Sequence, residues 1–255
     1  MLLDRHTWHD APERPIAVES DLHVWRIHLD QCEAVLHEFS KFLSADEMLR
    51  ADKFHFRRDR DHFVAARGAL RDILGGYVGL APGLLRFSYE RYGKPALSRE
   101  TGDELLRFNL SHSHGLALCA VTRGREVGID LELIREDSSG MEIAERFFSP
   151  REVSALRALP PSARTSAFFD CWTRKEAYIK ALGEGLTHPL QGFTVSLTPG
   201  EPAALLCADD PLEAGRWSLF ELFPGAAYRA ALAVEGEPPA LHCWRYPESG
   251  PPHST

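Results

Sequence analysis

Two long helical patterns with clear stop signals constrain the fold of this chain most strongly. The first covers residues 46–74, and Gly75-Gly76 is expected to end it. The second covers residues 162–182 and is expected to end at Gly183. Between and around these patterns lie short stretches in which apolar and polar residues alternate, which is typical of strands. The chain is therefore predicted to mix helices with short strands.

Helix start signals support this interpretation. Ser44 and Glu47 have the spacing of a capping box, in which the serine caps the helix and the glutamate reaches back. Ser149, Pro150 and Glu152 open another helix in the same way. A further helix is expected over residues 32–43. Strands are expected over residues 21–29, 85–89, 105–110, 116–121, 126–134, 193–197, 217–222, 228–234 and 241–246.

Composition narrows the class of protein. The chain has 255 residues, 44% of them apolar and 26% charged, which suits one large or two small globular domains. We find no apolar run of about 18 residues and no secretory signal, so we expect a cytoplasmic protein without a membrane span. A net charge of −8 argues against nucleic acid as a partner. Five scattered cysteines without a CxxC pair argue against a disulfide framework.

The strand predicted over residues 126–134 carries two acids on one face. Gly128, Asp130 and Glu132 alternate with apolar residues, so the two carboxylates project from the same side. Converging carboxylates repel each other unless a cation lies between them, and hard oxygen ligands favour Mg²⁺. Gly128 is expected to leave open space beside them. The alternative is a solvent-facing acidic edge, which alternating strands often have.

The second long helix carries a ridge of an aromatic ring, an acid and a base. Trp172, Glu176 and Lys180 are spaced by four residues, and Lys175 lies alongside. Two lysines and a carboxylate on one short stretch favour a site for a metal-bound phosphate. The alternative is a simple surface ion pair between Glu176 and Lys180, worth a few tenths of a kcal/mol.

Further phosphate-binding candidates lie in the first half of the chain. Ser111 and His112 follow a predicted strand, where hydroxyls, amides and an imidazole can bind phosphate. We find no third soft ligand for a zinc site with His112 and His114, and a Ser–His nucleophile is disfavoured because neighbours on a strand point to opposite faces. The first long helix carries seven basic residues, partly offset by aspartates: Arg50, Lys53, Arg57, Arg58, Arg60, Arg67 and Arg71.

Three blocks occur in a specific order along the chain: NLSHS at 109–113, GIDLE at 128–132 and WTRKEAYIK at 172–180. Two further blocks are YGKP at 92–95 and RFFS at 146–149. With this ordered set the chain resembles the 4′-phosphopantetheinyl transferases of the larger, surfactin-synthetase-activating type.

The resemblance implies an α+β fold of two similar halves in one chain. Each half would pack a long helix on a small antiparallel sheet, with the active site in the cleft between them. We therefore expect a loose lead-in over residues 1–20, an N-terminal half over 21–123, a C-terminal half over 124–246 and a disordered tail over 247–255. The resemblance also suggests a monomer, since one chain supplies both halves.

The resemblance also implies an activity. Such an enzyme transfers the 4′-phosphopantetheine group of coenzyme A to a serine hydroxyl of an apo carrier protein, and 3′,5′-ADP leaves. The reaction would depend on Mg²⁺ and would activate acyl or peptidyl carriers of fatty acid, polyketide or nonribosomal peptide synthesis. Two rival functions are a different Mg²⁺-dependent phosphoryl or phosphodiester enzyme and a non-catalytic module that binds coenzyme A or a carrier.

Site residues follow from the same resemblance. Asp130, Glu132 and Glu176 would hold Mg²⁺. Glu176 would be the general base, directly or through a metal-bound water, and Lys180 would offset charge in the transition state. The residues expected to contact coenzyme A are Arg50, Lys53, Lys94, Ser111, His112, Lys175 and Lys180. In the family, a basic residue is expected where this chain has Glu47.

Overall fold

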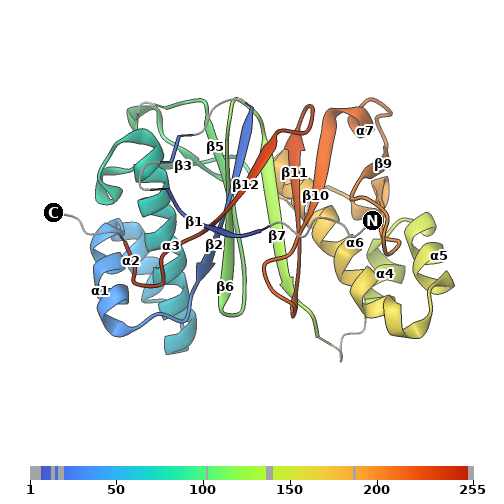
Figure 1. Cartoon of the computed structure of the whole chain (residues 1–255), viewed down its shortest axis with the longest axis horizontal. Helices are drawn as coiled ribbons and strands as arrows, with labels where there is room; N and C mark the ends of the chain where they lie inside the picture. Colours follow the sequence, from blue (N-terminus) through green and yellow to red (C-terminus); the bar gives the residue numbers. More distant parts are fainter. Residues whose placement is uncertain are drawn as a thin grey trace. The chain divides into compact units, whose positions relative to one another are not determined.

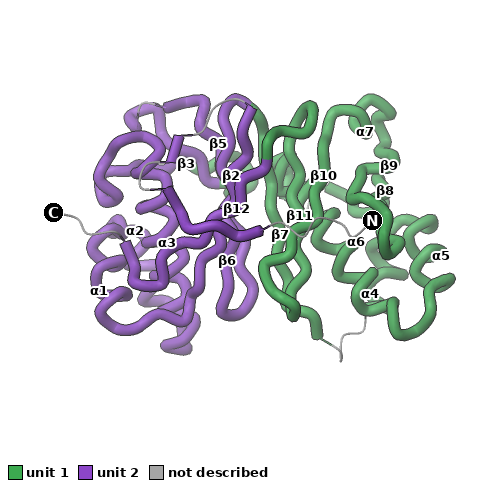
Figure 2. The backbone as a smooth tube through the Cα atoms, in the orientation of Figure 1, with its two compact units in different colours: residues 1–6, 89–94, 125–240 green, residues 7–88, 95–124, 241–255 purple. Residues whose placement is uncertain are grey.

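The structure is a computed structural model, and it describes residues 7–12, 15–16, 20–101, 103–135, 140–185 and 188–251. The chain divides into two compact units, coloured separately in Figure 2. The described part of unit 1 consists of Tyr89–Lys94 and Arg125–Ala240, less the gaps given above. Unit 2 contains the described residues of Thr7–Ser88, Pro95–Gly124 and Leu241–Thr255.

Unit 2 consists of a five-stranded sheet covered by helices on one face (Figure 1). The strand order is β1-β12-β2-β6-β5, and the pairs β2–β6 and β5–β6 are antiparallel. The long helix α3 (Arg57–Val78) packs beside α1 (Glu33–Phe42) and α2 (Ala45–Ala51). The strands are β1 (His9–Asp10), β2 (Asp21–His28), β5 (Leu106–Ser113), β6 (Leu116–Arg123) and β12 (Ala240–Arg245). A short pair, β3 (Phe87–Tyr89) and β4 (Pro95–Leu97), is attached.

Unit 1 repeats this plan with a three-stranded antiparallel sheet of order β10-β11-β7. Its long helix α6 (Pro161–Leu182) lies on β7 and β11 (Figure 1). The sheet strands are β7 (Val127–Leu133), β10 (Trp217–Leu222) and β11 (Tyr228–Glu235). The remaining elements are α4 (Gly140–Phe147), α5 (Pro150–Ala158), α7 (Glu213–Arg216), β8 (Phe193–Val195) and β9 (Leu205–Ala208). The predicted α+β class with two similar halves is confirmed.

The helix start signals form as the sequence predicts. Both capping boxes are present, at Ser44 with Glu47 and at Ser149 with Glu152. Helix α6 ends at Gly183, whose φ of 72° is a left-handed conformation that glycine adopts without strain.

The first long helical pattern folds differently from the prediction. Residues 46–74 do not form one helix, because α2 ends at Ala51 and α3 begins at Arg57. No proline or glycine marks this break. Helix α3 also continues through Gly75-Gly76 and ends at Gly79, whose φ is 69°. The helix therefore stops where glycine adopts a left-handed conformation, and the earlier pair stays helical.

Each unit of the structure includes one segment from the other side of the boundary near residue 124. The units divide between Gly124 and Arg125, but Tyr89–Lys94 belongs to unit 1 and β12 belongs to unit 2. Strand β12 belongs to unit 2 because its two edges pair with β1 and β2 in the sheet of that unit. The pair β1–β12 is parallel, unlike the purely antiparallel sheet that was expected.

The predicted ends of the chain are only partly described. Residues 1–6, 13–14 and 17–19 of the predicted lead-in and 252–255 of the predicted tail lie outside the described residues. Within the described part, the lead-in contributes β1, and Gly250 lies against Val35.

Candidate active site

The predicted acidic strand lies directly against the predicted catalytic helix, because Gly128 has no side chain. A Cβ atom built on Gly128 would lie 2.1 Å from the carbonyl oxygen of Ala177 and 2.3 Å from the amide nitrogen of Ala181. The space that was expected to be open beside the carboxylates is therefore filled by the backbone of α6. This close approach places side chains of α6 beside those of β7.

Asp130 and Lys180 meet at this contact. The Nζ atom of Lys180 lies 2.5 Å from Oδ1 of Asp130, as the charge-assisted hydrogen bond of an ammonium to a carboxylate. Asp130 is buried at 4% exposure, whereas the side chain of Lys180 is 29% exposed. Asp130 pairs across the sheet with Ala231, whose small side chain leaves room for the helix. The carboxylate is thus buried between sheet and helix, with the lysine reaching it from solvent.

Glu176 completes the cluster, one helical turn before Lys180. Its Oε1 atom is buried and has no hydrogen-bond partner among the described residues. Burial, reinforced by the charges of Asp130 and Glu132, raises the pKa of Glu176 to about 7, and the charge of Lys180 only partly opposes this. The structure therefore brings together all three predicted metal carboxylates and Lys180.

The chemistry of this cluster suits a hard divalent cation. Its donors are carboxylate oxygens, two of the three acids are mostly buried, and Oε1 of Glu176 has no hydrogen-bond partner in the described part of the chain. Mg²⁺ takes one or two carboxylates plus phosphate oxygens, and a cation here would offset the repulsion among the acids, which adds to burial in raising the pKa of Glu176. Asp130, Glu132 and Glu176 are the residues that could hold it.

Lys94 reaches the end of the same helix from the loop at 89–94. Its Nζ atom donates to the Ala181 carbonyl oxygen at 3.0 Å and to Glu126 Oε2 at 2.9 Å. A cation at a helix C-terminus is stabilised by the helix dipole. Lys94 therefore binds the carbonyl oxygen of the residue that follows Lys180, within unit 1.

Two family models match the chain in succession. The model described as 4′-phosphopantetheinyl transferase, N-terminal, matches residues 28–123, and that of the 4′-phosphopantetheinyl transferase superfamily matches residues 126–233. The 4′-phosphopantetheinyl transferase HetI of Nostoc sp. (strain PCC 7120) is 45% identical over 242 residues, which cover 95% of this chain and 99% of the relative. The chain belongs to the 4′-phosphopantetheinyl transferase superfamily.

Another relative of this transferase supports the predicted type. The 4′-phosphopantetheinyl transferase Sfp of Bacillus subtilis (strain 168) is 33% identical over 159 residues, 62% of this chain and 68% of the relative. The chain is thus an enzyme of the larger, surfactin-synthetase-activating type, which modifies carrier proteins with a phosphopantetheinyl group.

The structure places Lys175 in the interior of unit 1, where its side chain does not reach the surface. Its side chain is fully buried, and Nζ contacts Glu152 Oε2 at 2.9 Å and the carbonyl oxygens of Leu190 and Phe193 at 2.7 Å. An ammonium has three N–H donors, and these three acceptors use all of them. The prediction that Lys175 contacts coenzyme A is therefore wrong, because this lysine neutralises a buried glutamate.

The remaining predicted ligands of this transferase belong to unit 2. Ser111 and His112 lie on β5 opposite β6, with Ser111 buried and His112 exposed, as alternation on a strand requires. Arg50 is exposed near the end of α2, and its guanidinium lies 5.4 Å from the centre of the Phe63 ring. Lys53 is exposed in the turn that follows.

Ion pairs separate the seven basic residues of this region into two groups. Five of them pair with acids: Arg57, Arg58, Arg60, Arg67 and Arg71. Within the described ranges, Arg50 and Lys53 make no such pair. Glu47, found where the family was expected to have a basic residue, is buried and pairs with Arg67 and Arg71. Arg57, Arg58 and Arg60 thus lie on an exposed face of mixed charge, whereas Arg67 and Arg71 are largely buried against Glu47. Arg50 and Lys53 are the cations of this group left for an anionic ligand.

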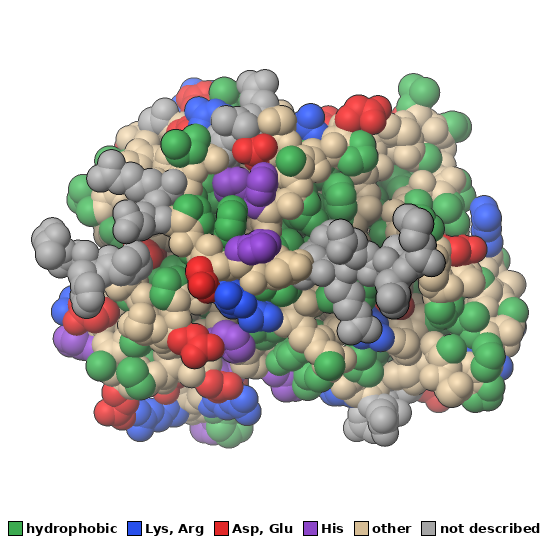
Figure 3. Space-filling model, viewed as in Figure 1, with side chains coloured by type: hydrophobic (Ala, Val, Ile, Leu, Met, Phe, Trp, Pro, Cys, Tyr) green, Lys and Arg blue, Asp and Glu red, His purple; other side chains and the backbone are tan. Residues whose placement is uncertain are grey.

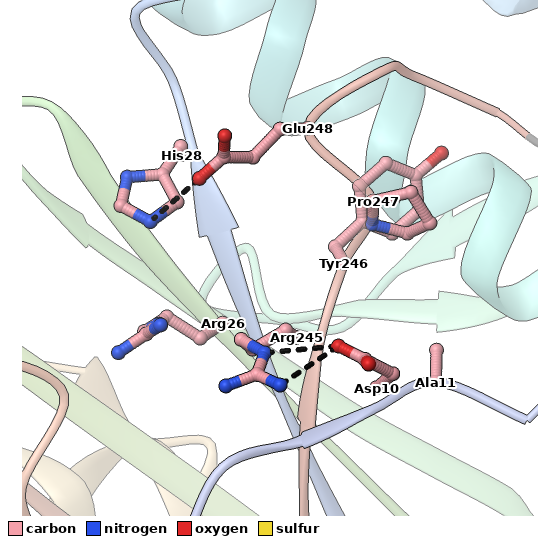
Figure 4. Close-up of a pocket in the computed structure, with 8 residues that line it drawn as sticks. All are labelled: Asp10, Ala11, Arg26, His28, Arg245, Tyr246, Pro247 and Glu248. Carbon is pink, nitrogen blue, oxygen red and sulfur yellow. Dashed lines mark hydrogen bonds and ion pairs between the residues drawn. The ribbon is translucent and has the colours of Figure 1, made fainter.

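A separate hollow of about 320 Å³ opens in unit 2, and none of the predicted site residues lines it (Figure 4). Arg245 donates to Asp10 Oδ1 there at 2.8 Å, and His28 lies 3.9 Å from Glu248. Acids and bases balance one another in this hollow.

No helix among the described residues is long and apolar enough to cross a membrane.

Sequence reasoning missed one cluster of ligand-type residues. Asp21 and His23 on β2 and His242 on β12 gather in unit 2, with one ligand atom of each within 4.8 Å of the others. The sequence offered no signal for it, because His242 lies at the opposite end of the chain from its neighbours and the interpretation of zinc ligands considered only nearby histidines.

Proposed function

We propose that this transferase moves the 4′-phosphopantetheine group from coenzyme A to a serine hydroxyl of an apo carrier protein, with Mg²⁺ as cofactor. The observation that carries the proposal is the cluster of Asp130, Glu132, Glu176 and Lys180 around the Gly128 contact. It combines hard oxygen donors, an unpartnered buried oxygen of Glu176 and one ammonium, which are the parts that a diphosphate substrate with a cation requires.

The proposed reaction is an in-line displacement at phosphorus. The serine oxygen forms a bond to the β-phosphate of coenzyme A, the bond from that phosphorus to the bridging oxygen breaks, and 3′,5′-ADP leaves. Bound Mg²⁺ would supply Lewis-acid neutralisation of the diphosphate oxygens. Asp130, Glu132 and Glu176 would hold the cation, and the close packing of β7 on α6 at Gly128 orients the side chains of both elements.

Glu176 is the group best suited to accept the serine proton. Its carboxylate lies in the cluster, and its buried Oε1 atom has no competing hydrogen bond from the described residues. A general base must reach the proton directly or through one water molecule. A water relay suits Glu176 better than direct transfer, because a carboxylate that also holds a cation is a weaker base.

The cations of the chain divide between the reacting phosphates and the rest of coenzyme A. Lys180, paired with Asp130 and partly exposed, would offset the charge that develops on the leaving phosphate. Lys94, Ser111 and His112 would contact the nucleotide end of coenzyme A. Arg50 and Lys53 suit the 3′-phosphate, since they are exposed and, in the described part of the chain, not neutralised by an acid.

The carrier protein is the second substrate, of fatty acid, polyketide or peptide synthesis. Carriers of this family tend to be acidic, so a net charge of −8 on the transferase requires a local basic or apolar docking surface. We also propose that the transferase acts as a cytoplasmic monomer.

Intact mass spectrometry of an apo carrier protein tests the reaction. The carrier is incubated with the transferase, coenzyme A and Mg²⁺, and a parallel sample contains EDTA. We expect the carrier to gain the mass of one phosphopantetheine group on its serine, and we expect EDTA to abolish the gain. Fatty acid, polyketide and peptide carriers are compared to rank the substrates.

The same experiment separates the rival functions. If no carrier gains mass while calorimetry detects coenzyme A binding, the chain is a binding module and the proposed activity is wrong. If coenzyme A is cleaved without modification of any carrier, the rival phosphodiester activity is supported. A gain in carrier mass that persists in EDTA would contradict the role of Mg²⁺ but not the transfer reaction.

A further inference from the structure

Histidines of unit 2 form a second candidate cation site, on a different unit from the carboxylate cluster. His23 on β2 and His242 on β12 are on neighbouring strands, and Asp21 lies two residues before His23. The rings of His23 and His242 are 5.2 Å apart and nearly perpendicular. Histidine side chains are visible among acids and bases near the middle of the face shown in Figure 3.

The spacing within this cluster is too wide for hydrogen bonds and suits a bridging ion. Asp21 Oδ2 lies 4.0 Å from Nε2 of His23, and Asp21 Oδ1 lies 3.9 Å from Nε2 of His242. Hydrogen bonds to nitrogen extend to about 3.2 Å. Ligand atoms of a tetrahedral zinc site lie roughly 3.3 Å apart, since each is about 2.0–2.1 Å from the metal. The two Asp21 contacts, which involve different oxygens of the carboxylate, would each need to close by roughly 0.6–0.7 Å to reach that geometry. One ligand atom of each residue lies within 4.8 Å of the others, so closure of at most about 1.5 Å is required.

A hydrogen-bond network behind His23 supports a metal-binding orientation of its ring. Tyr77 Oη lies 2.6 Å from Nδ1 of His23 and accepts a hydrogen bond from Trp25 Nε1 at 2.9 Å. When Tyr77 also accepts the Nδ1 proton of His23, the lone pair of that ring is on Nε2, which faces Asp21. Metal-binding histidines generally donate their other ring nitrogen to such a second partner, which fixes the tautomer.

One side of the cluster is open to solvent, so its side chains have space to rotate toward an ion. The side chain of His23 is buried at 5% exposure, whereas that of His242 is 40% exposed and stacks on Trp244. The side chain of Asp21 is 21% exposed and, among the described residues, accepts one weak hydrogen bond, from Ser20 at 3.3 Å. A fixed imidazole, a carboxylate and an adjustable imidazole therefore face one point.

We propose that Asp21, His23 and His242 form a binding site for a divalent transition metal of the Zn²⁺ type, separate from the Mg²⁺ site. Two imidazoles and one carboxylate suit Zn²⁺, Ni²⁺ or Cu²⁺, while Mg²⁺ prefers oxygen ligands alone. Three protein ligands leave a fourth position for water. The ion joins β12, from the end of the chain, to β2, and so stabilises the unit 2 sheet in proportion to its binding.

Calorimetric titration of Zn²⁺ into the chelator-treated full chain tests this site, with excess Mg²⁺ present to occupy the carboxylate cluster. We expect one Zn²⁺ to bind per chain and to raise the melting temperature. His242→Ala is the main variant, because the exposed side chain can be removed without disturbing the fold, and it should weaken binding at least about 10-fold. His55→Ala, at an exposed histidine of the same unit, is the matched control and should bind as the wild type does.

Two more variants place the ion. Tyr77→Phe keeps the ring and removes the hydroxyl, and it should weaken Zn²⁺ binding by about 10–100-fold. Asp130→Ala should leave Zn²⁺ binding unchanged, because that residue belongs to the carboxylate cluster. The proposal is overturned if the wild type binds no Zn²⁺ in the presence of excess Mg²⁺. It is also overturned if His242→Ala binds Zn²⁺ as tightly as the wild type, or if Asp130→Ala abolishes Zn²⁺ binding.

Discussion

The long helices of the two units, α3 and α6, are built alike. Both have 22 residues and end at a glycine with positive φ. Counted from the first residue of each helix, Arg71 and Lys175 both occupy position 15, and both are buried. Each pairs with the capping-box glutamate of the preceding short helix: Arg71 with Glu47 and Lys175 with Glu152. The two units therefore use the same buried ion pair to fix a helix start to a long helix.

The difference begins at the next position. Asp72 in α3 accepts a hydrogen bond from the Tyr246 hydroxyl at 2.6 Å, whereas Oε1 of Glu176 in α6 has no partner among the described residues. Position 20 is Gly76 in α3 and Lys180 in α6, and only the lysine pairs with an acid of the adjacent sheet. One scaffold thus occurs twice, and the candidate active site lies where one oxygen of its acid has no hydrogen-bond partner among the described residues.

Breaking the shared ion pair should give the largest effect. Lys175→Met leaves Glu152 buried without a counter-charge, and we expect it to lower the free energy of unfolding by about 3–5 kcal/mol. Arg71→Met should cost less, because Glu47 keeps Arg67. Urea unfolding measures both, with Lys41→Met in an exposed pair as control, expected at about 0–1 kcal/mol. Equal losses for Lys175 and Lys41 would contradict a shared structural role.

Glu176→Gln should have the next largest effect, now on activity. It removes the proposed base and a carboxylate of the cation site, so we expect the transfer rate to fall by roughly 10²–10³-fold, or about 2.7–4 kcal/mol in the barrier. Asp72→Asn, the equivalent change in α3, is the matched control and should keep near-normal turnover. The transfer rate is measured by carrier mass at several Mg²⁺ concentrations. A similar loss in both variants would mean that position 16 matters for folding alone.

Gly128→Ala should have an intermediate effect, because it separates β7 from α6. The added methyl group would overlap the backbone of Ala177 and Ala181, and overpacking of this kind costs about 1–3 kcal/mol in stability. Gly215→Ala is the control, since nothing lies within 4 Å of its Cβ position. Thermal unfolding and the transfer rate are measured together. A Gly128→Ala variant as stable and active as the wild type would show that the close approach is not required.

The smallest expected effect is the contribution of Asp72 to the pH dependence of stability. Burial raises the pKa of Asp72 above its ordinary value, and the Tyr246 hydrogen bond only partly opposes this. The native state therefore holds this proton more tightly than the unfolded chain does, so the contribution of Asp72 to stability falls as the pH rises from about 4 to its raised native pKa. The stability of Asp72→Asn lacks this dependence. Unfolding of both proteins across this range checks it, and parallel curves would contradict the raised pKa.

Local signals in the sequence predicted much of the fold. Ser44 and Ser149 start helices as predicted because the atoms of a capping box all lie within four residues. Strands such as Trp217–Leu222 were predicted from a short apolar-rich stretch with Pro and Gly turns around it. The break between α2 and α3 was missed because no breaker residue marks it, and Gly75-Gly76 misled because glycine permits a helix end without requiring one.

Predictions about the site also depended on whether the contacts involved are local or distant in the sequence. Asp130 and Glu176 were predicted from motifs that lie within single elements. Lys175 was assigned wrongly because the partner that neutralises it, Glu152, belongs to another helix. The space beside Gly128 was misjudged for the same reason, since the backbone of α6 fills it.

The most direct test of the cation site is calorimetric titration of Mg²⁺ into the coenzyme A-saturated protein. Wild type, Glu176→Gln and Asp72→Asn are compared after removal of metals with a chelator. We expect one Mg²⁺ per chain in the wild type and in Asp72→Asn, and binding weakened by at least about 10-fold in Glu176→Gln, because only that variant loses a carboxylate of the cluster. Equal Mg²⁺ affinity in all three proteins would contradict the assignment of the cation site to unit 1.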